Sequence, residues 1–347
     1  MSYSKHLCLV TPGFPANKQD DTCVPYVQDF LRLFTALKPD VRFTVVALQY
    51  PYTTKSYAWN NVRVYPCGGE NKRFVGKVKT WLKAKRILDI IHESQPIDVV
   101  HSLWLTEATL LAQQWAQKKK VLHVATAMGQ DVLKSNNYLK LVNLAKLRLV
   151  VVSKAQQSAP ERNLGVVKSE IIPWVVEEVK PSNSEKVVDV LGVGSLIKVK
   201  QFELFIEVLE HIGRTKKSIQ ARIIGDGPER GNLEALASKL PTNITLNFLG
   251  HLSRNQVFDY MSKSKVLLHC SKFESQGFVF NEAVASGMTI VSTPVGIAQE
   301  MERWSLADNP EDLAIAVTTQ LGQYYSSTRL FSADEMVESY SQIYSSF

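Results

Sequence analysis

The chain has 347 residues, which at about 150 residues per domain predicts two domains. Its hydrophobic content of 45% and charged content of 21% are those of a globular protein, and no apolar run approaches the ~20 residues that span a bilayer. Residues 1–180 hold 25 Lys and Arg against 14 Asp and Glu, a net charge of +11, whereas the rest of the chain holds 15 against 19, or −4. The basic amino-terminal half is therefore expected to meet something anionic, such as a membrane surface, a phosphorylated acceptor or nucleic acid.

The cysteines and the first residues carry information about the compartment. Four scattered cysteines form no CxxC motif and no disulfide-like spacing: Cys8, Cys23, Cys67 and Cys270. The opening apolar run is too short for a signal peptide and predicts a first strand. Both features favour a cytoplasmic protein. The seven His and four Cys show no zinc-ligand spacing and no nucleic-acid-binding module is present, so we expect neither a metal nor nucleic acid as a partner.

Apolar, strand-like runs alternate with helical patterns through the first half of the chain. We expect strands at residues 6–10, 42–48, 98–101, 121–126, 149–152 and 171–173, and helices near 24–37, 74–93, 106–118 and 137–146. This alternation is typical of parallel sheets built from βαβ units. The carboxyl edge of such a sheet would carry the loop of Gly13, the segment 98–104, and the loop of Met128 and Asp131.

The predicted helix at 74–93 overlaps a strongly basic segment. Seven cations and no acid lie from Lys72 to Arg86, and one apolar stripe is formed by Phe74, Val78, Trp81 and Leu82. Amphipathic helices of this kind are drawn to anionic lipid, so an anionic membrane surface is an expected partner. The alternative is an ordinary domain helix that turns its apolar stripe to its own sheet and its basic face to water.

The alternation restarts after the polar segment 177–186, with strands expected at 187–193, 222–224, 244–249, 266–269 and 289–292. The two series predict an α/β protein of two doubly wound, Rossmann-like domains, residues 1–180 and 181–330, that face each other across a cleft. Residues 331–347 show a helical apolar stripe, with Ser332 as N-cap and Glu335 completing a capping box. We expect this C-terminal helix to pack back on the N-terminal domain.

Two carboxylates, Glu274 and Glu282, stand eight residues apart with Gly277 between them. One continuous helix would place Gly277 in its interior, where glycine is costly. The pattern therefore favours a loop that carries Glu274 after the strand at 266–269, and a helix that starts near Gly277 and carries Glu282 about one turn in. Open α/β folds bind ligands at this carboxyl edge of the sheet. The alternative is a pair of solvated surface glutamates.

Two glycine loops at strand ends are candidates for binding an anion. Gly194 would let the backbone turn tightly beside a diphosphate, with Lys198 or Lys200 supplying positive charge. Gly296 could present its N–H group to a phosphate. A plain surface loop or turn explains each of them equally well. Gly192-x-Gly194 lacks the third glycine of a dinucleotide fingerprint, which disfavours a nicotinamide-dependent oxidoreductase.

Taken in order, these segments resemble the large group 1 family of retaining glycosyltransferases with the GT-B fold. The resemblance is strongest from Gly250 to Glu300, where an aliphatic strand, Ser271, the two spaced glutamates, Glu-Ala-x-Ala-x-Gly and a Gly-x-x-x-Glu loop follow at family spacing. The segment 194–196 followed by Lys200 is similar to the family's entry into its second domain. The loop 12–15 is similar to the family's opening loop.

The resemblance implies roles for individual residues. The catalytic residues would be Glu274, which contacts hydroxyls of the donor sugar, and Lys200, which neutralises the diphosphate. Glu282 would bond the ribose of the donor. The other donor-binding positions would be Gly194, Ser195, Gly277, Phe278, Gly296 and Glu300. The acceptor or sugar side would be formed by Gly13, Met128 and Asp131.

Three departures from the family pattern bear on activity. Ser195 replaces an Arg, Met128 replaces a His, and Asp20-Asp21 stand near where the family has a Gly-Gly pair. The resemblance implies a cytoplasmic, retaining, metal-independent hexosyl- or related glycosyltransferase, peripheral on the inner face of the membrane. It would need no cofactor, and would move a sugar from a nucleotide-diphosphate sugar to a glycan or lipid-linked acceptor, as in surface polysaccharide assembly. The alternative, motivated by Ser195 and Met128, is a catalytically weak nucleotide-sugar-binding partner protein.

Overall fold

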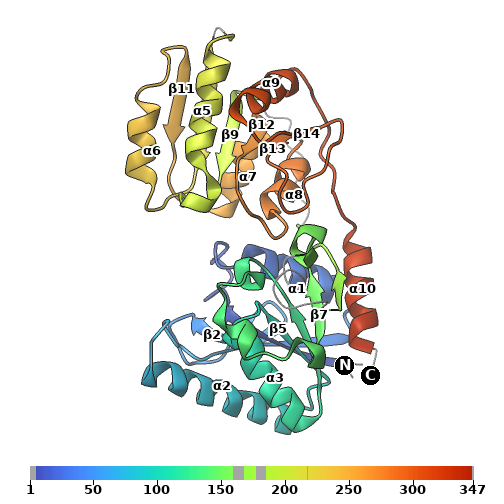
Figure 1. The fold of residues 1–347 in the computed structure, drawn as a ribbon. Coiled ribbons are helices and arrows are strands. Elements are labelled where there is room, and N and C mark those ends of the chain that lie inside the picture. The colour runs from blue at the N-terminus through green and yellow to red at the C-terminus, as the bar shows by residue number, and fades with distance from the viewer. Residues whose placement is uncertain (1–4, 159–167, 177–184, 217, 346–347) are drawn as a thin grey trace. The chain divides into compact units, whose positions relative to one another are not determined.

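The computed structural model describes residues 5–158, 168–176, 185–216 and 218–345 (Figure 1). The chain forms two compact units: unit 1 is Met1–Glu177 with Phe331–Phe347, and unit 2 is Glu178–Leu330. Most of the polar linker predicted at 177–186 lies outside the described residues. Within the described residues, no helix combines the length and the apolar character needed to cross a bilayer.

Among its described residues, unit 1 contains an eight-stranded sheet in the order β3-β4-β2-β1-β5-β6-β7-β8. The strands are β1 (Lys5–Gly13), β2 (Val41–Tyr50), β3 (Tyr57–Trp59), β4 (Val62–Pro66), β5 (Val99–Leu103), β6 (Leu122–Thr126), β7 (Arg148–Val151) and β8 (Ser169–Ile171). All neighbours pair in parallel except β3 with β4. The parallel βαβ organisation predicted from the sequence is confirmed, with the β3–β4 hairpin as an addition.

Helices cover both faces of this sheet because successive side chains of a strand point to opposite sides. Cys8 and Val10 of β1 pack in a core with α2 (Val75–Ser94) and α3 (Glu107–Lys119). The opposite face meets α1 (Pro25–Leu37) and α10 (Ala333–Ser345), whose aromatic side chains gather around Phe43 and His101.

The C-terminal helix α10 belongs to unit 1 through three buried hydrogen bonds. Tyr340 Oη lies 2.9 Å from Thr126 Oγ1 and accepts from Trp174 Nε1 at 2.8 Å. Tyr344 Oη lies 2.8 Å from His101 Nδ1. Burial lowers the pKa of His101 to about 3, so this imidazole stays neutral and structural. The Ser332 cap predicted for this helix is present, since Ser332 Oγ accepts the N–H of Glu335 at 3.3 Å.

Unit 2 contains, among its described residues, a six-stranded parallel sheet in the order β11-β10-β9-β12-β13-β14. The strands are β9 (Val188–Val193), β10 (Ile219–Ile224), β11 (Ile244–Phe248), β12 (Ser264–His269), β13 (Thr289–Ser292) and β14 (Trp304–Leu306). The helices are α5 (Phe202–Gly213), α6 (Arg230–Ala237), α7 (Arg254–Ser262), α8 (Phe278–Ala285) and α9 (Pro310–Gln320). Numbered from β9, the strand order is the 3-2-1-4-5-6 order of a Rossmann fold.

This strand order places the switch point of unit 2 between β9 and β12. At a switch point the connections leave to opposite faces of the sheet, which opens a crevice beyond the carboxyl ends of the two strands. Here α5 follows β9 and packs with α9 on one face, while α7 and α8 pack on the other. The residues that follow Val193 and His269 are therefore the candidates for a ligand site in unit 2.

One predicted helix is wrong. Residues 137–146 form two short 3₁₀ turns, Asn137–Lys140 and Leu144–Lys146. The cause is a pair of asparagines: the side chain of Asn136 accepts the N–H of Tyr138, and that of Asn143 accepts the N–H of Ala145. Such local bonds compete with a continuous helix. The strand predicted at 171–173 also lies two residues earlier, at Ser169–Ile171.

Candidate functional site

Three glycines form a floor of bare backbone at the carboxyl ends of β9, β10 and β11. Gly194 follows β9 with φ 154°, and Gly225 follows β10 with φ 134°. A Cβ atom at Gly225 would lie 1.9 Å from the carbonyl oxygen of Gly194, so no other residue fits there. The N–H of Gly225 donates to the carbonyl of Gly250 at 2.9 Å. The close approach of the two backbones therefore requires glycine at position 225.

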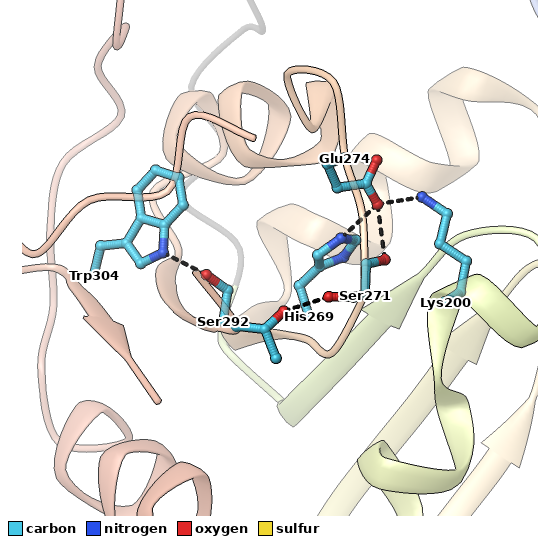
Figure 2. A network of polar contacts seen from close by, with 7 residues as sticks. Lys200, His269, Ser271, Glu274, Ser292 and Trp304 are labelled. Atoms are coloured by element: carbon cyan, nitrogen blue, oxygen red, sulfur yellow. Dashed lines mark hydrogen bonds and ion pairs between the residues drawn. The ribbon is translucent and has the colours of Figure 1, made fainter. Parts of the chain in front are cut away.

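The carboxylate of Glu274 is the centre of a polar network beside this floor (Figure 2). Its Oε1 atom lies 2.5 Å from Lys200 Nζ, 2.9 Å from His269 Nε2 and 2.8 Å from Ser271 Oγ. Lys200 ends the turn after β9, whereas the other two residues follow or end β12. The N–H of Lys272 donates to the carbonyl of Val199 at 2.8 Å and holds the two loops together.

The electrostatics of this network keep Glu274 charged. Burial alone would raise the pKa of this carboxyl, but the hydrogen bond from His269 and the positive charge of Lys200 outweigh it and lower the pKa to about 2. Burial also lowers the pKa of His269, against the opposing effect of Glu274. The imidazole is therefore neutral at physiological pH, and its Nε2–H group donates to the carboxylate.

All three of these contacts use one oxygen of Glu274. Within the described part of the chain Oε2 accepts no hydrogen bond, and Figure 2 shows it pointing away from the three donors. A carboxylate oxygen is an acceptor only, so Oε2 is suited to a hydroxyl donor from a ligand. The aliphatic stem of Lys200 lies beside Gly194. Its Cδ and Cε atoms are 3.7 Å from the position that a Cβ atom would take at this glycine.

The loop of Gly296 packs on the loop that precedes α8. Gly277 caps α8 with φ 79°, and Phe278 is the first residue of the helix. The N–H of Ile297 donates to the carbonyl of Gln276 at 3.0 Å, and a Cβ at Gly296 would lie 2.4 Å from that same carbonyl oxygen. The structure thus brings Gly277 and Gly296 together beside Glu274.

The remaining unit 2 candidates differ in their surroundings. Glu282 lies on α8 and faces Arg254 of α7, with 3.8 Å between Oε1 and Nη2 and both side chains largely buried. Sequence reasoning missed Arg254, because its only signal is a position at the start of a helix after a Ser cap. Glu300 is exposed and accepts the N–H of Leu306 at 2.8 Å. Ser195 is exposed at the rim of the β9 loop.

In unit 1, Asp131 organises a strand-end loop. Its carboxylate accepts the N–H groups of Leu105 at 2.7 Å, Gly129 at 2.6 Å and Met128 at 3.3 Å. Burial raises the pKa of Asp131, against the opposing effect of these bonds. The side chain of Met128 is buried, and Gly13 ends β1 with its backbone partly exposed. These residues lie at the carboxyl edge of the unit 1 sheet.

A separate cavity of about 1030 Å³ lies in unit 1, at the amino ends of β6, β7 and β8, where Leu122, Arg148 and Ser169 line it. Ligands of open α/β folds bind at the opposite edge, so we place no donor site there.

Comparison with solved structures defines the class of fold. The chain aligns over 99% of its length with S. aureus TarM, covering 100% of that chain, at a TM-score of 0.74 and 12% identity. It aligns with Anabaena HepE, solved in complex with UDP-glucose, over 99% of this chain and 100% of that one, at a TM-score of 0.68 and 16% identity. Two parallel α/β sheets of this kind define a GT-B fold, as the sequence predicted.

Sequence comparison matches unit 2 to a family. Residues 176–304 match the model of the Glycosyl transferases group 1 family. Over 158 residues, 43% of this chain, it is 28% identical to the phosphatidylinositol N-acetylglucosaminyltransferase gpi3 subunit of Schizosaccharomyces pombe. Over 65% of this chain it is 25% identical to an uncharacterized glycosyltransferase of Methanocaldococcus jannaschii. The matches span 34% and 64% of those two relatives.

Proposed function

We propose that the protein is a retaining glycosyltransferase that binds a nucleotide-diphosphate sugar in unit 2 and moves the sugar to an acceptor held by unit 1. The observation that carries this proposal is the network around Glu274 at the switch point of the Rossmann-like sheet. It combines a cation, a charged carboxylate with one open oxygen, and a glycine floor that admits a ligand against the backbone.

Each part of the network has a task in this reaction. Negative charge builds on the nucleoside diphosphate as its bond to the anomeric carbon breaks, and Lys200 stabilises that charge. The backbone around Gly194, Ser195, Gly277, Phe278 and Gly296 provides N–H groups for the phosphates or the sugar. An acceptor hydroxyl oxygen bonds to the anomeric carbon, and its proton leaves with the diphosphate. We propose that this reaction needs no metal, since Lys200 and backbone donors meet the developing charge.

The two glutamates position the donor. Oε2 of Glu274 accepts a sugar hydroxyl, which fixes the sugar relative to Lys200. Glu282, one turn into α8, accepts a ribose hydroxyl, and Arg254 orients its carboxylate. Glu300 lies at the edge of the donor site, where its carboxylate accepts the N–H of Leu306.

The relatives indicate the class of donor and acceptor. TarM was solved with UDP and alpha-GlcNAc-glycerol, and another structural neighbour is a lipopolysaccharide outer core galactosyltransferase. The gpi3 subunit is named for a transfer to phosphatidylinositol. We propose a glycan or lipid-linked acceptor, as in surface polysaccharide assembly, and a peripheral position on the cytoplasmic face of an anionic membrane through the basic segment Lys72 to Arg86.

A catalytically weak nucleotide-sugar-binding partner is the second candidate. It is favoured by Ser195, which leaves Lys200 without the family's second cation. Titration of nucleoside diphosphates, nucleotide sugars and NAD into the protein separates donor binding from dinucleotide binding. Release of nucleoside diphosphate when acceptor extracts are added then separates an enzyme from a binder. The proposal fails if NAD binds and nucleotide sugars do not.

A further inference from the structure

Helix α2 turns an apolar face to solvent. Its buried side chains are Thr80, Ala84, Leu88 and Ile91, which pack toward the sheet. On the outward side, Val75 is 68% exposed, Val78 52% and Leu82 63%. Trp81 alone of the predicted stripe points inward, where its indole N–H donates to Glu107 Oε2 at 2.7 Å. Three of the four predicted stripe residues therefore do not bury against the sheet, and α2 packs on the sheet through a different set of side chains.

Positive charge surrounds the exposed aliphatic side chains. Lys79 and Arg86 are both exposed and, at about 100° per residue, lie on the same outward side as Val75 and Leu82. No acid occurs between Lys72 and Arg86. A face that mixes aliphatic side chains with cations gains from an anionic, partly apolar surface, whereas a soluble polyanion would leave the aliphatic groups in water.

A cavity of about 390 Å³ adjoins the start of α2. Its lining residues are Gln49, Asn71, Lys72, Arg73, Phe74, Lys77 and Glu107. Gln49 comes from the carboxyl end of β2, so the cavity lies at the carboxyl edge of the unit 1 sheet. Phe74, 85% exposed at φ 49°, lines this cavity and directly precedes the first residue of α2.

The charge of the cavity is positive. Its only carboxylate among the lining residues, Glu107, accepts hydrogen bonds from Gln49 and Trp81 and faces Lys77 at 3.7 Å. Lys72 contacts Glu70 at the surface, 3.1 Å away. The three cations Lys72, Arg73 and Lys77 outnumber the carboxylates of Glu107 and Glu70, and the resulting net positive charge suits a phosphate, which takes several charge-assisted hydrogen bonds.

We propose that the acceptor is a phosphate-bearing lipid: α2 lies on an anionic bilayer with Val75, Val78 and Leu82 in the headgroup boundary, and the adjoining cavity takes the lipid's phosphate. This inference rests on the proposed function for the transfer itself. It assigns the class of acceptor and the surface that recognises it, and it commits the apolar face of α2 to a bilayer.

Vesicle sedimentation tests the bilayer contact. The full-length protein should sediment with phosphatidylcholine vesicles that contain phosphatidylglycerol, and far less with phosphatidylcholine alone. Val78→Ser with Leu82→Ser should lower the partition coefficient at least tenfold, and Lys79→Glu should lower it at least fivefold. Ile315→Ser, at a 65% exposed aliphatic residue of unit 2, is the matched control and should leave partitioning unchanged. Equal partitioning of wild type and the double variant would overturn the bilayer contact.

A second arm tests the phosphate. At matched surface charge, wild type should prefer phosphatidylglycerol vesicles to vesicles of an anionic sulfolipid, and Arg73→Glu should remove the preference. An equal affinity of wild type for both lipids would overturn the phosphate site. Inorganic phosphate that released the protein fully from vesicles would identify a soluble phosphate ligand instead, which also overturns the lipid assignment. Nucleotide-sugar titration of each variant reports folding, and its loss in wild type would mark failure of the proposed function rather than of this inference.

Discussion

Replacement of Glu274 by Gln tests the polar network at the switch point. The side chain is 13% exposed, and its pKa is held at about 2 against an ordinary value of 4.5. That difference corresponds to about 3 kcal/mol of unfolding free energy at neutral pH. Because the folded-state pKa is the lower one, this stability is fully present above pH 4.5 and is lost as the pH falls toward 2. Glu274→Gln should therefore unfold more easily at neutral pH, and the gap from wild type should close across that window.

Hydrogen exchange of the β12 amides, followed against pH, measures this gap within unit 2. Asp189→Asn is a matched control, because Asp189 forms a comparable pair with Lys265 at 2.7 Å at the amino ends of β9 and β12, the edge of the sheet opposite the candidate site. The control should lose stability and keep its affinity for a nucleotide sugar, whereas Glu274→Gln should lose both. A Glu274→Gln protein with the stability of wild type at pH 7, or a gap that widens in acid, would refute the assignment of charge in this network.

Three further substitutions, one of them with a matched control, separate function from folding. Glu282→Ala should weaken nucleotide-sugar binding by about tenfold to hundredfold in calorimetry, since a charged hydrogen bond contributes ~1.5–3 kcal/mol, and unchanged affinity removes it from the site. Gly225→Ala should destabilise unit 2 by about 3 kcal/mol or more in urea unfolding, because its Cβ would lie 1.9 Å from a carbonyl oxygen at positive φ. Gly231→Ala, with nothing within 4 Å, should be neutral or stabilising, and equal effects would contradict this reasoning. Tyr344→Phe leaves His101 Nδ1 buried without its partner and should cost unit 1 about 1–3 kcal/mol; an unchanged unfolding midpoint would show that α10 is not held by this bond.

Local patterns in the sequence predicted much of unit 2. The strand, glycine and helix that carry Glu274, Gly277 and Glu282 follow from neighbouring residues, and all three lie where the pattern puts them. The pairing of Lys200 with Glu274 joins residues 74 positions apart, and only the 3-2-1-4-5-6 strand order makes β9 and β12 neighbours. The sequence indicated both Lys200 and Glu274 as candidates. The family resemblance assigned Lys200 to the diphosphate and Glu274 to the donor sugar, and did not pair them with each other.

Long-range packing explains the predictions that failed or were incomplete. The alternative in which the stripe of α2 turns to its own sheet fails, because α2 packs there through a face that starts with the small Thr80 and Ala84, although the stripe with Phe74 and Leu82 is also apolar. Small side chains let a helix approach a sheet closely, a preference that helical periodicity alone does not reveal. The β3–β4 hairpin was missed because its strands are only three and five residues long.

The anomeric configuration of the product tests the central claim most directly. The protein is incubated with the nucleotide-diphosphate sugar that binds best and with membrane extract as acceptor, and NMR compares the anomeric centre before and after transfer. We predict release of the nucleoside diphosphate, a product with the configuration of the donor, and loss of both in Lys200→Met. An inverted product, or full turnover in Lys200→Met, would contradict a retaining transfer at the switch point of unit 2.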